Sequence, residues 1–383
     1  MEQAEGFQVN SEVKLVYKLN KSLYGLKQSG RNWNNMLHTY LLENNFVQNA
    51  VDHCIYTMKN ENEMVIILVW VDDLIIAATN DELLSKIKQM LNDKFHMKDL
   101  GTLSYFLGIS FEQGEGYVKM NQTKYLLKIL EKFEMSNCKP RSTPCEQKLE
   151  CNGDEQIDST KYREVVGSLI YAMTCTRPDI CWIVTKLSQY LSKPQKEHWV
   201  AAKHVLRYLK GTVNYDLCYR KCEGDLSLVG YSDADWASST EDRRSTTGYC
   251  FSLTETSPLV SWKSRKQPVV ALSSCESEYI ALSAAVQEGL YLTQLINDIK
   301  VGINQNSILI FEDNQGTIAL SKNPVNRSRA KHIDIKYHFI RDAVNKGKVV
   351  LEYCPTGEMV ADVMTKPTTR CKMEKFKNFI FGT

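Results

Sequence analysis

Apolar residues recur at both helical and strand spacing along this chain, which predicts a fold that mixes the two kinds of element. In the first third, residues 27–47 and 81–95 show helical spacing. Residues 103–111 and 116–121 are predicted to pair as strands, and residues 122–133 to form another helix. Strands and helices thus alternate, an order typical of an α+β arrangement.

Two adjacent acids interrupt the most apolar stretch of this first third. Residues 63–78 contain two strand-like apolar runs separated by Asp72 and Asp73. The pattern predicts a buried hairpin with both acids at its tip. Because burying two neighbouring carboxylates is costly unless a cation compensates their charge, the hairpin is a candidate metal site, with a simple Asp-Asp turn as the alternative.

A change of composition separates this region from the next. Residues 136–159 are poor in apolar residues and contain two prolines, which indicates a loop or linker. Helices are predicted over 162–175, 179–191 and 197–210, and residues 211–225 close this helical connector.

From residue 226 onward, short strands and helices follow one another. The predicted order is strands over 226–231, 247–254 and 259–264, a helix over 275–299, a strand over 308–312, helices over 316–321 and 330–345, a strand over 348–353 and a helix from Glu358. This order is mixed α/β.

The composition is that of an ordinary globular protein. Of 383 residues, 43% are hydrophobic, enough for two or three cores. No run of about eighteen apolar residues suggests a membrane span. The twelve cysteines are expected to be reduced, and Cys218 and Cys222 lack the second ligand pair of a structural zinc site. We expect a cytoplasmic or nuclear protein without a membrane partner.

The formal charge of +2 gives no global argument for nucleic-acid binding, so local clusters must provide it. One cluster holds Lys18, Lys21, Lys27 and Arg31, and another holds Arg327, Arg329, Lys331 and His332. A solvated surface is the alternative interpretation of each.

Carboxylates stand at the ends of several elements after residue 226. Mg²⁺ prefers oxygen ligands, and two such ions about 3.5 to 4 Å apart can stabilise both the attacking and the departing oxygen of a phosphodiester. Helix-dipole stabilisation is the alternative role for an acid at a helix start. The candidates are Asp233 and Asp235 after the first strand, Glu276 and Glu278 in the first turns of the long helix, Asp313 at a strand end, and Asp362 entering the last helix.

Five stretches in this region closely resemble the ribonuclease H of Ty1/copia retrotransposons. They are GYSDADWASSTEDRRSTTGYCFSL, SWKSRKQPVVALSSCESEYIAL, EDNQGTIAL, RAKHIDIKYHFIRD and ADVMTKP. The resemblance implies that Asp233, Glu278, Asp313 and Asp362 are catalytic metal ligands, with Asp235 and Glu276 as second candidates. It implies one ion held by the first three acids and a second held by Asp233 and Asp362.

The preceding region is similar to the polymerase palm, primer grip and connector of the same elements, through LNKSLYGLKQSGRNW, WVDDLIIA, YFLGISF and VGSLIYAMTCTRPDI. The resemblance implies that Asp72 and Asp73 are the metal-binding catalytic pair of a reverse transcriptase, and that Lys27, Gln28 and Arg31 contact template or nucleotide. The expected domains are a truncated palm (1–135), a linker with a helical thumb or connection (136–225) and a ribonuclease H-like mixed-sheet domain (226–383).

The start MEQAEGF looks like the segment that follows the first catalytic aspartate in such polymerases, with Ala4 in place of proline. We therefore expect the fingers and that aspartate to be missing, and no DNA synthesis from this chain alone.

The expected activity is cleavage of the RNA strand of RNA–DNA hybrids with two Mg²⁺ ions, or Mn²⁺ in their place. Expected partners are RNA–DNA hybrid, DNA, RNA and other Pol products of the same element. The alternatives are a catalytically silent nucleic-acid-binding remnant and a non-functional one. The remaining candidate contacts to nucleic acid are Lys263, Arg265 and Lys266, and Arg329, Lys331, His332, Lys336 and Arg341.

Overall fold

The computed structural model describes residues 1–8, 15–146, 149, 155–222, 226–299, 307–322 and 331–382, with the side chains of 331–334 and 337 left out. The chain divides into two compact units, Met1–Leu100 and Gly101–Thr383. No helix among the described residues is long and apolar enough to span a bilayer. Each unit is described by itself.

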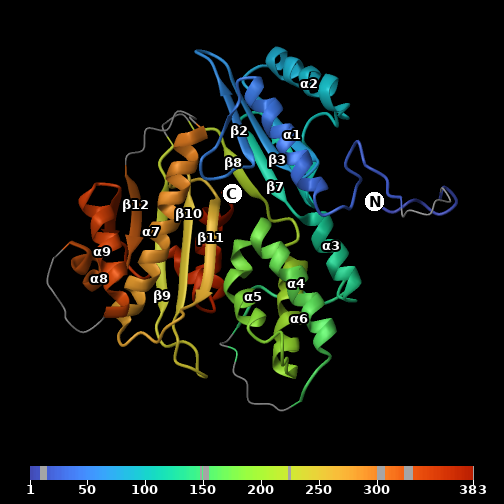
Figure 1. The fold of residues 1–383 in the computed structure, drawn as a ribbon. Helices are drawn as coiled ribbons and strands as arrows, with labels where there is room; N and C mark the ends of the chain where they lie inside the picture. Colours follow the sequence, from blue (N-terminus) through green and yellow to red (C-terminus); the bar gives the residue numbers. More distant parts are fainter. Residues whose placement is uncertain are drawn as a thin grey trace. The chain divides into compact units, whose positions relative to one another are not determined.

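The first unit is an antiparallel sheet with two helices (Figure 1). Leu37 and Leu41 of one helix and Leu83 of the other join Val65 and Ile67 of the sheet in one core. The second helix begins where it does because the side chain of Asn80 accepts a hydrogen bond from the backbone N–H of Leu83. In chain order the elements are α1 (Ser29–Glu43), β1 (Val47–Gln48), β2 (Ile55–Lys59), β3 (Met64–Trp70), β4 (Asp73–Ala78) and α2 (Asp81–Phe95), and the sheet order is β1-β2-β3-β4.

The predicted hairpin around the two adjacent acids is present as β3 and β4. Trp70 pairs with Asp73, so Val71 and Asp72 form the connecting loop. The prediction that the acids are buried was wrong, because Asp72 and Asp73 are both exposed. The buried positions of β3 alternate and end at Val69, before the tip, so the hairpin extends beyond the core that covers its base.

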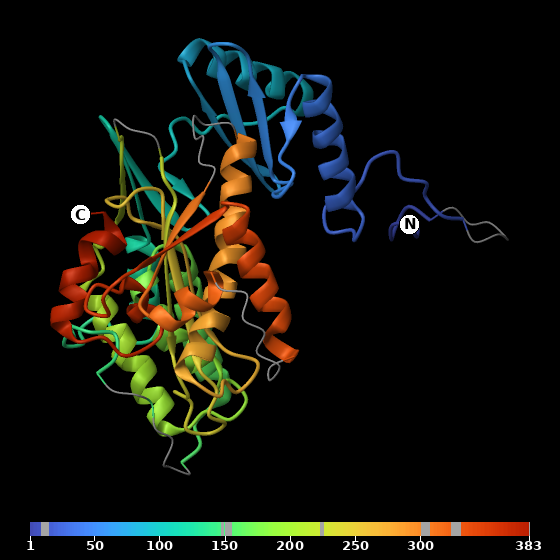
Figure 2. The same ribbon diagram turned by 90° about the vertical axis from the view of Figure 1, so that its left-hand side faces the viewer.

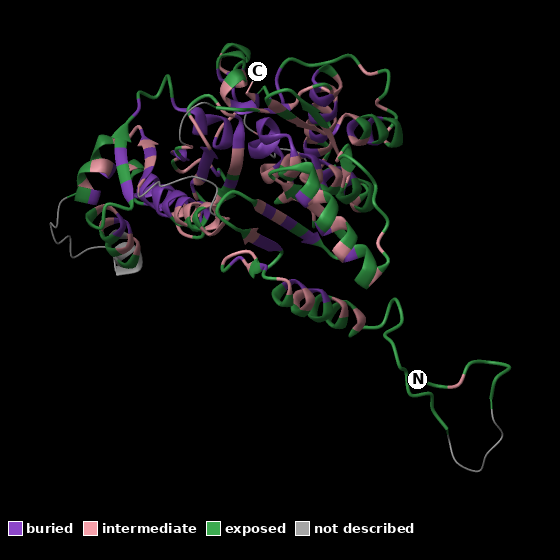
Figure 3. Cartoon of the chain, turned by 90° about the horizontal axis from the view of Figure 1, so that it is seen from above, coloured by how far each residue is buried: buried purple, intermediate pink, exposed green. Residues whose placement is uncertain are grey.

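The described residues that precede α1 contribute nothing to this core. Residues 15–28 are all exposed, and so are residues 1–8 apart from Gln3 (Figure 3, green beside the N label). Lys27 and Gln28 therefore present their side chains to solvent.

The second unit contains a small antiparallel sheet with the order β5-β6-β7-β8, and helices that share a core. Strand β8 was not predicted. It lies in residues 211–225, which were expected only to close the helical connector, and it pairs with β7. The helix predicted over 179–191 is shorter and starts after a 3-10 turn. The elements are β5 (Tyr105–Phe106), β6 (Ile109–Gly114), β7 (Tyr117–Asn121), α3 (Thr123–Lys132), α4 (Ser159–Cys175), η1 (Pro178–Ile180), α5 (Cys181–Ser188), α6 (Lys196–Gly211) and β8 (Leu217–Arg220).

A buried ion pair fixes the ends of these helices. The Arg177 guanidinium donates to both carboxylate oxygens of Asp179, at 3.0 and 2.7 Å, and to the carbonyl of Thr212 at 3.0 Å. The hydroxyl of Tyr208 also donates to Asp179, at 2.6 Å. Arg177 and Asp179 are both fully enclosed, and the network satisfies charges that would otherwise be costly to bury.

The rest of the second unit is a five-stranded mixed sheet with the order β11-β10-β9-β12-β13. The first three strands in the chain pair antiparallel, and β12 runs parallel to β9 and to β13. The elements are β9 (Val229–Asp235), β10 (Thr246–Ser252), β11 (Leu259–Lys266), α7 (Ser274–Ile299), β12 (Ile308–Glu312), α8 (Gln315–Lys322), α9 (Lys331–Asn345), β13 (Val349–Tyr353), η2 (Val360–Met364) and α10 (Arg370–Phe381).

Helices cover both faces of this sheet. Figures 1 and 2 show α7 lying along one face. On β10, Tyr249 and Phe251 pack with Leu282 of α7, whereas Cys250 points the other way and packs with Met364 of η2. This alternation is the two-residue period of a strand buried on both sides.

The mixed sheet and the connector helices share packing. Cys181 and Leu217 lie in the same core as Cys250. The indole N–H of Trp262 donates to the carbonyl of Met173 at 2.9 Å. The mixed α/β fold class is confirmed, and the sheet is held partly by residues that precede position 226.

Two placements differ from the sequence prediction. Asp233 and Asp235 lie within β9 rather than after it, because β9 stays paired with β10 as far as Asp235. Asp362 lies in the short 3-10 helix η2 rather than in the last helix. Pro367 separates the two, since a proline disfavours helical geometry in the residue before it.

Candidate active site

Three carboxylates meet beside the five-stranded sheet. One carboxylate oxygen of each of three residues, Asp233, Glu278 and Asp313, lies within 4.8 Å of the other two. Asp233 comes from β9, Glu278 from the first turns of α7, and Asp313 directly follows β12. They meet because β9 and β12 are adjacent parallel strands and α7 packs on them. Within the described part of the chain, no other group of three metal-binding side chains forms.

Asp233 and Glu278 are almost enclosed, which raises their pKa values, whereas Asp313 is half-buried. Burial raises the pKa of Asp233 to about 7; the nearby Lys366 ammonium opposes this shift and the Asp362 carboxylate adds to it. Burial raises the pKa of Glu278 to about 11, and the carboxylate of Glu312 contributes further. Ionising Glu278 at neutral pH therefore requires a compensating cation.

Glu312 is a functional candidate that the sequence analysis missed. Its side chain is fully buried, and burial raises its pKa well above the usual range. One oxygen accepts from the backbone N–H of Asn314 at 3.3 Å, and the other has no hydrogen-bond partner. The signal was present in the sequence, because Glu312 shares the inward-facing parity of Ile308 and Ile310 on β12.

Asp362 lies near Asp233 but outside the group of three. It is 1% exposed, and its carboxylate forms ion pairs with Lys366 and Lys372. The Thr365 hydroxyl donates to Asp233 and so links η2 to β9. Lys366 follows Asp362 by four residues, a spacing that could have indicated the pair.

The structure brings Asp233 and Glu278 into the group, and not the second candidates Asp235 and Glu276. One oxygen of Glu276 accepts from the backbone N–H of Leu272 at 2.8 Å, a bond that holds the loop before α7. Asp235 lies at the end of β9, half-exposed.

The carboxylate group fits a hard divalent cation. Every donor is an oxygen, which is the ligand type that Mg²⁺ and Mn²⁺ take in proteins. Glu278 and Glu312 each keep one buried oxygen without a hydrogen-bond partner among the described residues, so each has an oxygen free to act as a ligand.

The residues of the predicted basic surfaces differ in their exposure and contacts. Lys263 and Arg265 are exposed on one face of the edge strand β11, whereas Lys266 forms an ion pair with Asp242 at 3.0 Å. The pKa of Lys336 on α9 is lowered by burial and by the nearby Arg265. Two surfaces that are far apart in the sequence therefore approach each other.

The remaining candidates of the predicted basic helix are Arg329, Lys331, His332 and Arg341. Arg341 donates to the carbonyl of Leu320 at 3.3 Å and so contacts the end of α8. Arg329 lies outside the described residues, as do the side chains of Lys331 and His332.

The two adjacent acids of the first unit lie at an exposed hairpin tip. The indole N–H of Trp33 on α1 donates to the carbonyl of Val71 at 2.8 Å, so α1 supports the hairpin tip that bears Asp72 and Asp73. Arg31 is exposed two residues before Trp33.

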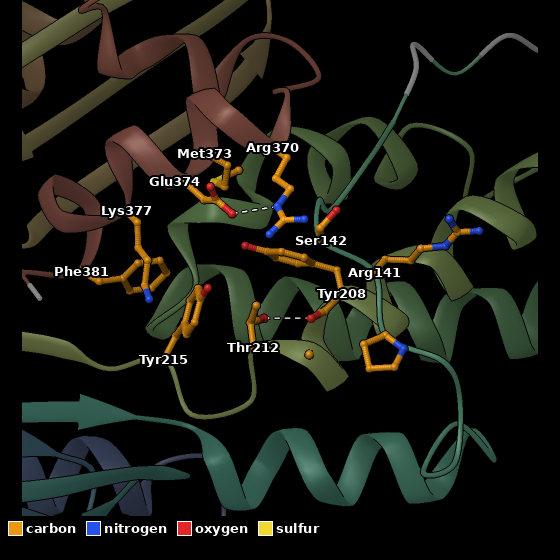
Figure 4. A pocket seen from close by; sticks show the side chains of 12 residues that line it. Arg141, Ser142, Tyr208, Thr212, Tyr215, Arg370, Met373, Glu374, Lys377 and Phe381 are labelled. Carbon is orange, nitrogen blue, oxygen red and sulfur yellow. Dashed lines mark hydrogen bonds and ion pairs between the residues drawn. The ribbon is translucent and has the colours of Figure 1, made fainter.

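A pocket between the end of α6 and α10 contains none of these residues (Figure 4). Tyr208, Tyr215 and Phe381 line it, and Arg370 pairs with Glu374 at its rim. None of the four carboxylates Asp233, Glu278, Asp313 and Asp362 therefore lines this pocket.

Comparison with known proteins identifies the origin of this arrangement. The family described as reverse transcriptase (RNA-dependent DNA polymerase) matches residues 1–147. A Retrovirus-related Pol polyprotein from transposon TNT 1-94 of Nicotiana tabacum is 39% identical over 99% of this chain. A transposon Ty5-1 protein of Saccharomyces cerevisiae is 33% identical over 75% of this chain and 94% of its own length. The chain belongs to the Ty1/copia-type Pol family.

This Pol chain spans 29% of the length of the tobacco polyprotein. The reverse transcriptase family covers its first part, and the five-stranded mixed sheet lies after the matched residues. Among solved structures, ribonuclease H1 from the halophilic archaeon Halobacterium salinarum aligns with 36% of this chain and 94% of its own, at 13% identity and a TM-score of 0.28. The predicted family is confirmed.

Proposed function

We propose that this chain hydrolyses the RNA strand of RNA–DNA hybrids with two Mg²⁺ ions, for which Mn²⁺ can substitute. The observation that supports this most directly is the meeting of Asp233, Glu278 and Asp313 from three elements of the mixed sheet, with Asp362 beside Asp233. When bound, the ions supply Lewis-acid stabilisation of the attacking and departing oxygens.

The chain's own residues prepare the site for this chemistry. Threonine hydroxyls orient two of the carboxylates. The Thr365 hydroxyl donates to Asp233, and the Thr356 hydroxyl donates to Asp313 at 2.8 Å. Such hydrogen bonds fix the direction in which a ligand oxygen points. Glu278 must give up its proton to serve as a ligand, so ion binding is coupled to proton release.

The proposed substrate is recognised by shape and charge. A hybrid presents phosphates and the 2′-hydroxyls of a wide minor groove, which a protein reads without sequence preference. Lys263, Arg265 and Lys336 form the surface assigned to these phosphates. Binding that depends on such contacts weakens steeply as the salt concentration rises.

The test is cleavage of a hybrid labelled on its RNA strand by the full chain, with Mg²⁺ or with EDTA. The full chain is needed because Cys181 and Leu217 complete the core beneath the mixed sheet. We expect Mg²⁺-dependent cutting of the RNA strand, no cutting of duplex DNA, and loss of cutting in Asp313→Asn. Hybrid binding without cleavage would instead support the silent, nucleic-acid-binding remnant.

The proposal includes the loss of polymerase activity. Asp72 and Asp73 are exposed, and no third metal-binding side chain joins them among the described residues. Because polymerisation needs ligands for two ions, we expect no primer extension by this chain on an RNA template. Extension that disappears in Asp72→Asn would contradict this expectation. DNA, RNA and other Pol products of the same element remain proposed partners, in the cytoplasm or nucleus.

A further inference from the structure

Two lysines converge on Asp362. The Lys366 ammonium lies 2.5 Å from one oxygen of Asp362 and 3.9 Å from the nearer oxygen of Asp233. Lys372 of α10 forms an ion pair with the other oxygen of Asp362 and also donates to the carbonyl of Thr356 at 3.2 Å. A single lysine thus stands between two carboxylates that were expected to share a metal ion.

The positive charge is distributed unevenly around Asp233. On the side of Glu278 and Asp313, no lysine or arginine in the described part of the chain forms an ion pair with either acid. In contrast, the ammonium groups of Lys366 and Lys372 contact the Asp362 carboxylate directly. A divalent ion would therefore compete with protein cations at Asp362 but not at Glu278 or Asp313.

The two lysines also differ from each other. Lys366 reaches both Asp233 and Asp362, and about a third of its side chain is exposed. Lysine has a flexible four-carbon stem, so its ammonium can turn into solvent without a rearrangement of the backbone. Lys372 touches Asp362 but not Asp233, and a backbone carbonyl holds it.

We propose that Lys366 is a tethered cation on the Asp233–Asp362 side of the cluster, which a divalent ion displaces when it binds there. The inference rests on the proposed function and extends it, because it makes Lys366 a positioning residue. The Asp233–Glu278–Asp313 side takes an ion first, and Lys366 keeps Asp362 neutralised until the second ion arrives. Lys372 holds the Asp362 carboxylate in place throughout.

Lysine labelling of the unmodified full chain tests the displacement without any change in sequence. Acetylation of each lysine is measured by mass spectrometry in EDTA and in saturating Mn²⁺. Lys366 should react several-fold faster with Mn²⁺, because its ammonium has been released to solvent. Lys375, which pairs with Glu358 at 2.5 Å on the same helix as Lys372, should react equally in both. Labelling of Lys366 that stays constant or falls with Mn²⁺ overturns the proposal.

Binding of Mn²⁺ to the full chain without nucleic acid gives a second test, read from the electron paramagnetic resonance signal of free Mn²⁺. Lys366→Met should bind a second ion about tenfold or more tightly than the unmodified chain, because the Lys366 ammonium no longer competes with it for Asp233 and Asp362. Lys366→Arg and the matched control Lys375→Met should bind like the unmodified chain. Equal second-ion binding in all four proteins contradicts the proposal.

The two proposals fail in different ways. A chain that cleaves no hybrid, yet releases Lys366 on binding Mn²⁺, refutes the nuclease and leaves the tethered cation in place. A chain that cleaves hybrid with Lys366 equally reactive in EDTA and Mn²⁺ refutes only the tethered cation.

Discussion

Asp233→Asn should weaken the pH dependence of folding stability in the metal-free chain between about pH 4 and pH 7, to which the buried Glu278 and Glu312 also contribute. Asp233 is 2% exposed, and burial raises its pKa from 3.8 to about 7. A carboxyl group whose pKa is raised by folding prefers to be protonated in the folded state. Its contribution to stability is complete below pH 4 and is lost as the pH rises through 7.

The magnitude follows from the size of the shift. A change from 3.8 to about 7 is about three pKa units, and each unit corresponds to about 1.4 kcal/mol. The metal-free chain should therefore lose up to about 4 kcal/mol of stability over this range through Asp233, and Asp233→Asn should lose none of it. Mg²⁺ should restore the lost stability of the unmodified chain at pH 8, because it binds the ionised form.

The assay is urea unfolding followed by circular dichroism in EDTA at pH 5 and at pH 8. The informative quantity is the change in unfolding free energy between the two values, compared between variant and unmodified chain. Asp235→Asn is the matched control, since Asp235 lies outside the group of three carboxylates. Equal changes in the unmodified chain and in Asp233→Asn would refute the reasoning.

Three further substitutions test other parts of the fold by urea unfolding. Glu312→Gln should stabilise the metal-free chain by about 1 to 3 kcal/mol at pH 8 and by less at pH 5, because it removes a buried acid with an unpartnered oxygen; a loss of stability would contradict this. Arg177→Met should cost about 3 to 5 kcal/mol by leaving Asp179 buried and unpaired, and adding Asp179→Asn should recover part of it. Gly248→Ala should cost about 1 to 3 kcal/mol, because the new methyl would lie 2.8 Å from the Cβ of Met364 and push η2 from the sheet. An unchanged unfolding free energy in Gly248→Ala would show that η2 shifts to accommodate the new methyl group.

Local pattern was sufficient for most elements of the fold. The predicted helix over 81–95 matches α2 residue for residue, and the predicted strand over 308–312 matches β12. In both, the apolar period and the boundary residues lie next to each other in sequence, so no distant contact is needed to define the element. The family was likewise evident from motifs, and the acids that it marked include the three that meet.

Several features of the site required the tertiary structure. The alternation of apolar residues along β3 does not show how far the hairpin tip with Asp72 and Asp73 extends past the core. That distance depends on the helices packed at the base of the hairpin. Strand β8 was missed because its partner β7 lies almost a hundred residues earlier in the chain. Pairing over such a separation leaves no local periodic signal.

The sequence by itself determined the family, the mixed α/β class and the set of acids from which the site is built. Only the tertiary structure decided which of them converge, namely Asp233, Glu278 and Asp313 as a group with Asp362 beside Lys366, and it added Glu312, which the sequence analysis missed. The reason is physical. Acids are marked by their own residue type, whereas the burial that shifts a pKa and the lysine that neutralises a charge depend on which strands and helices the fold brings together.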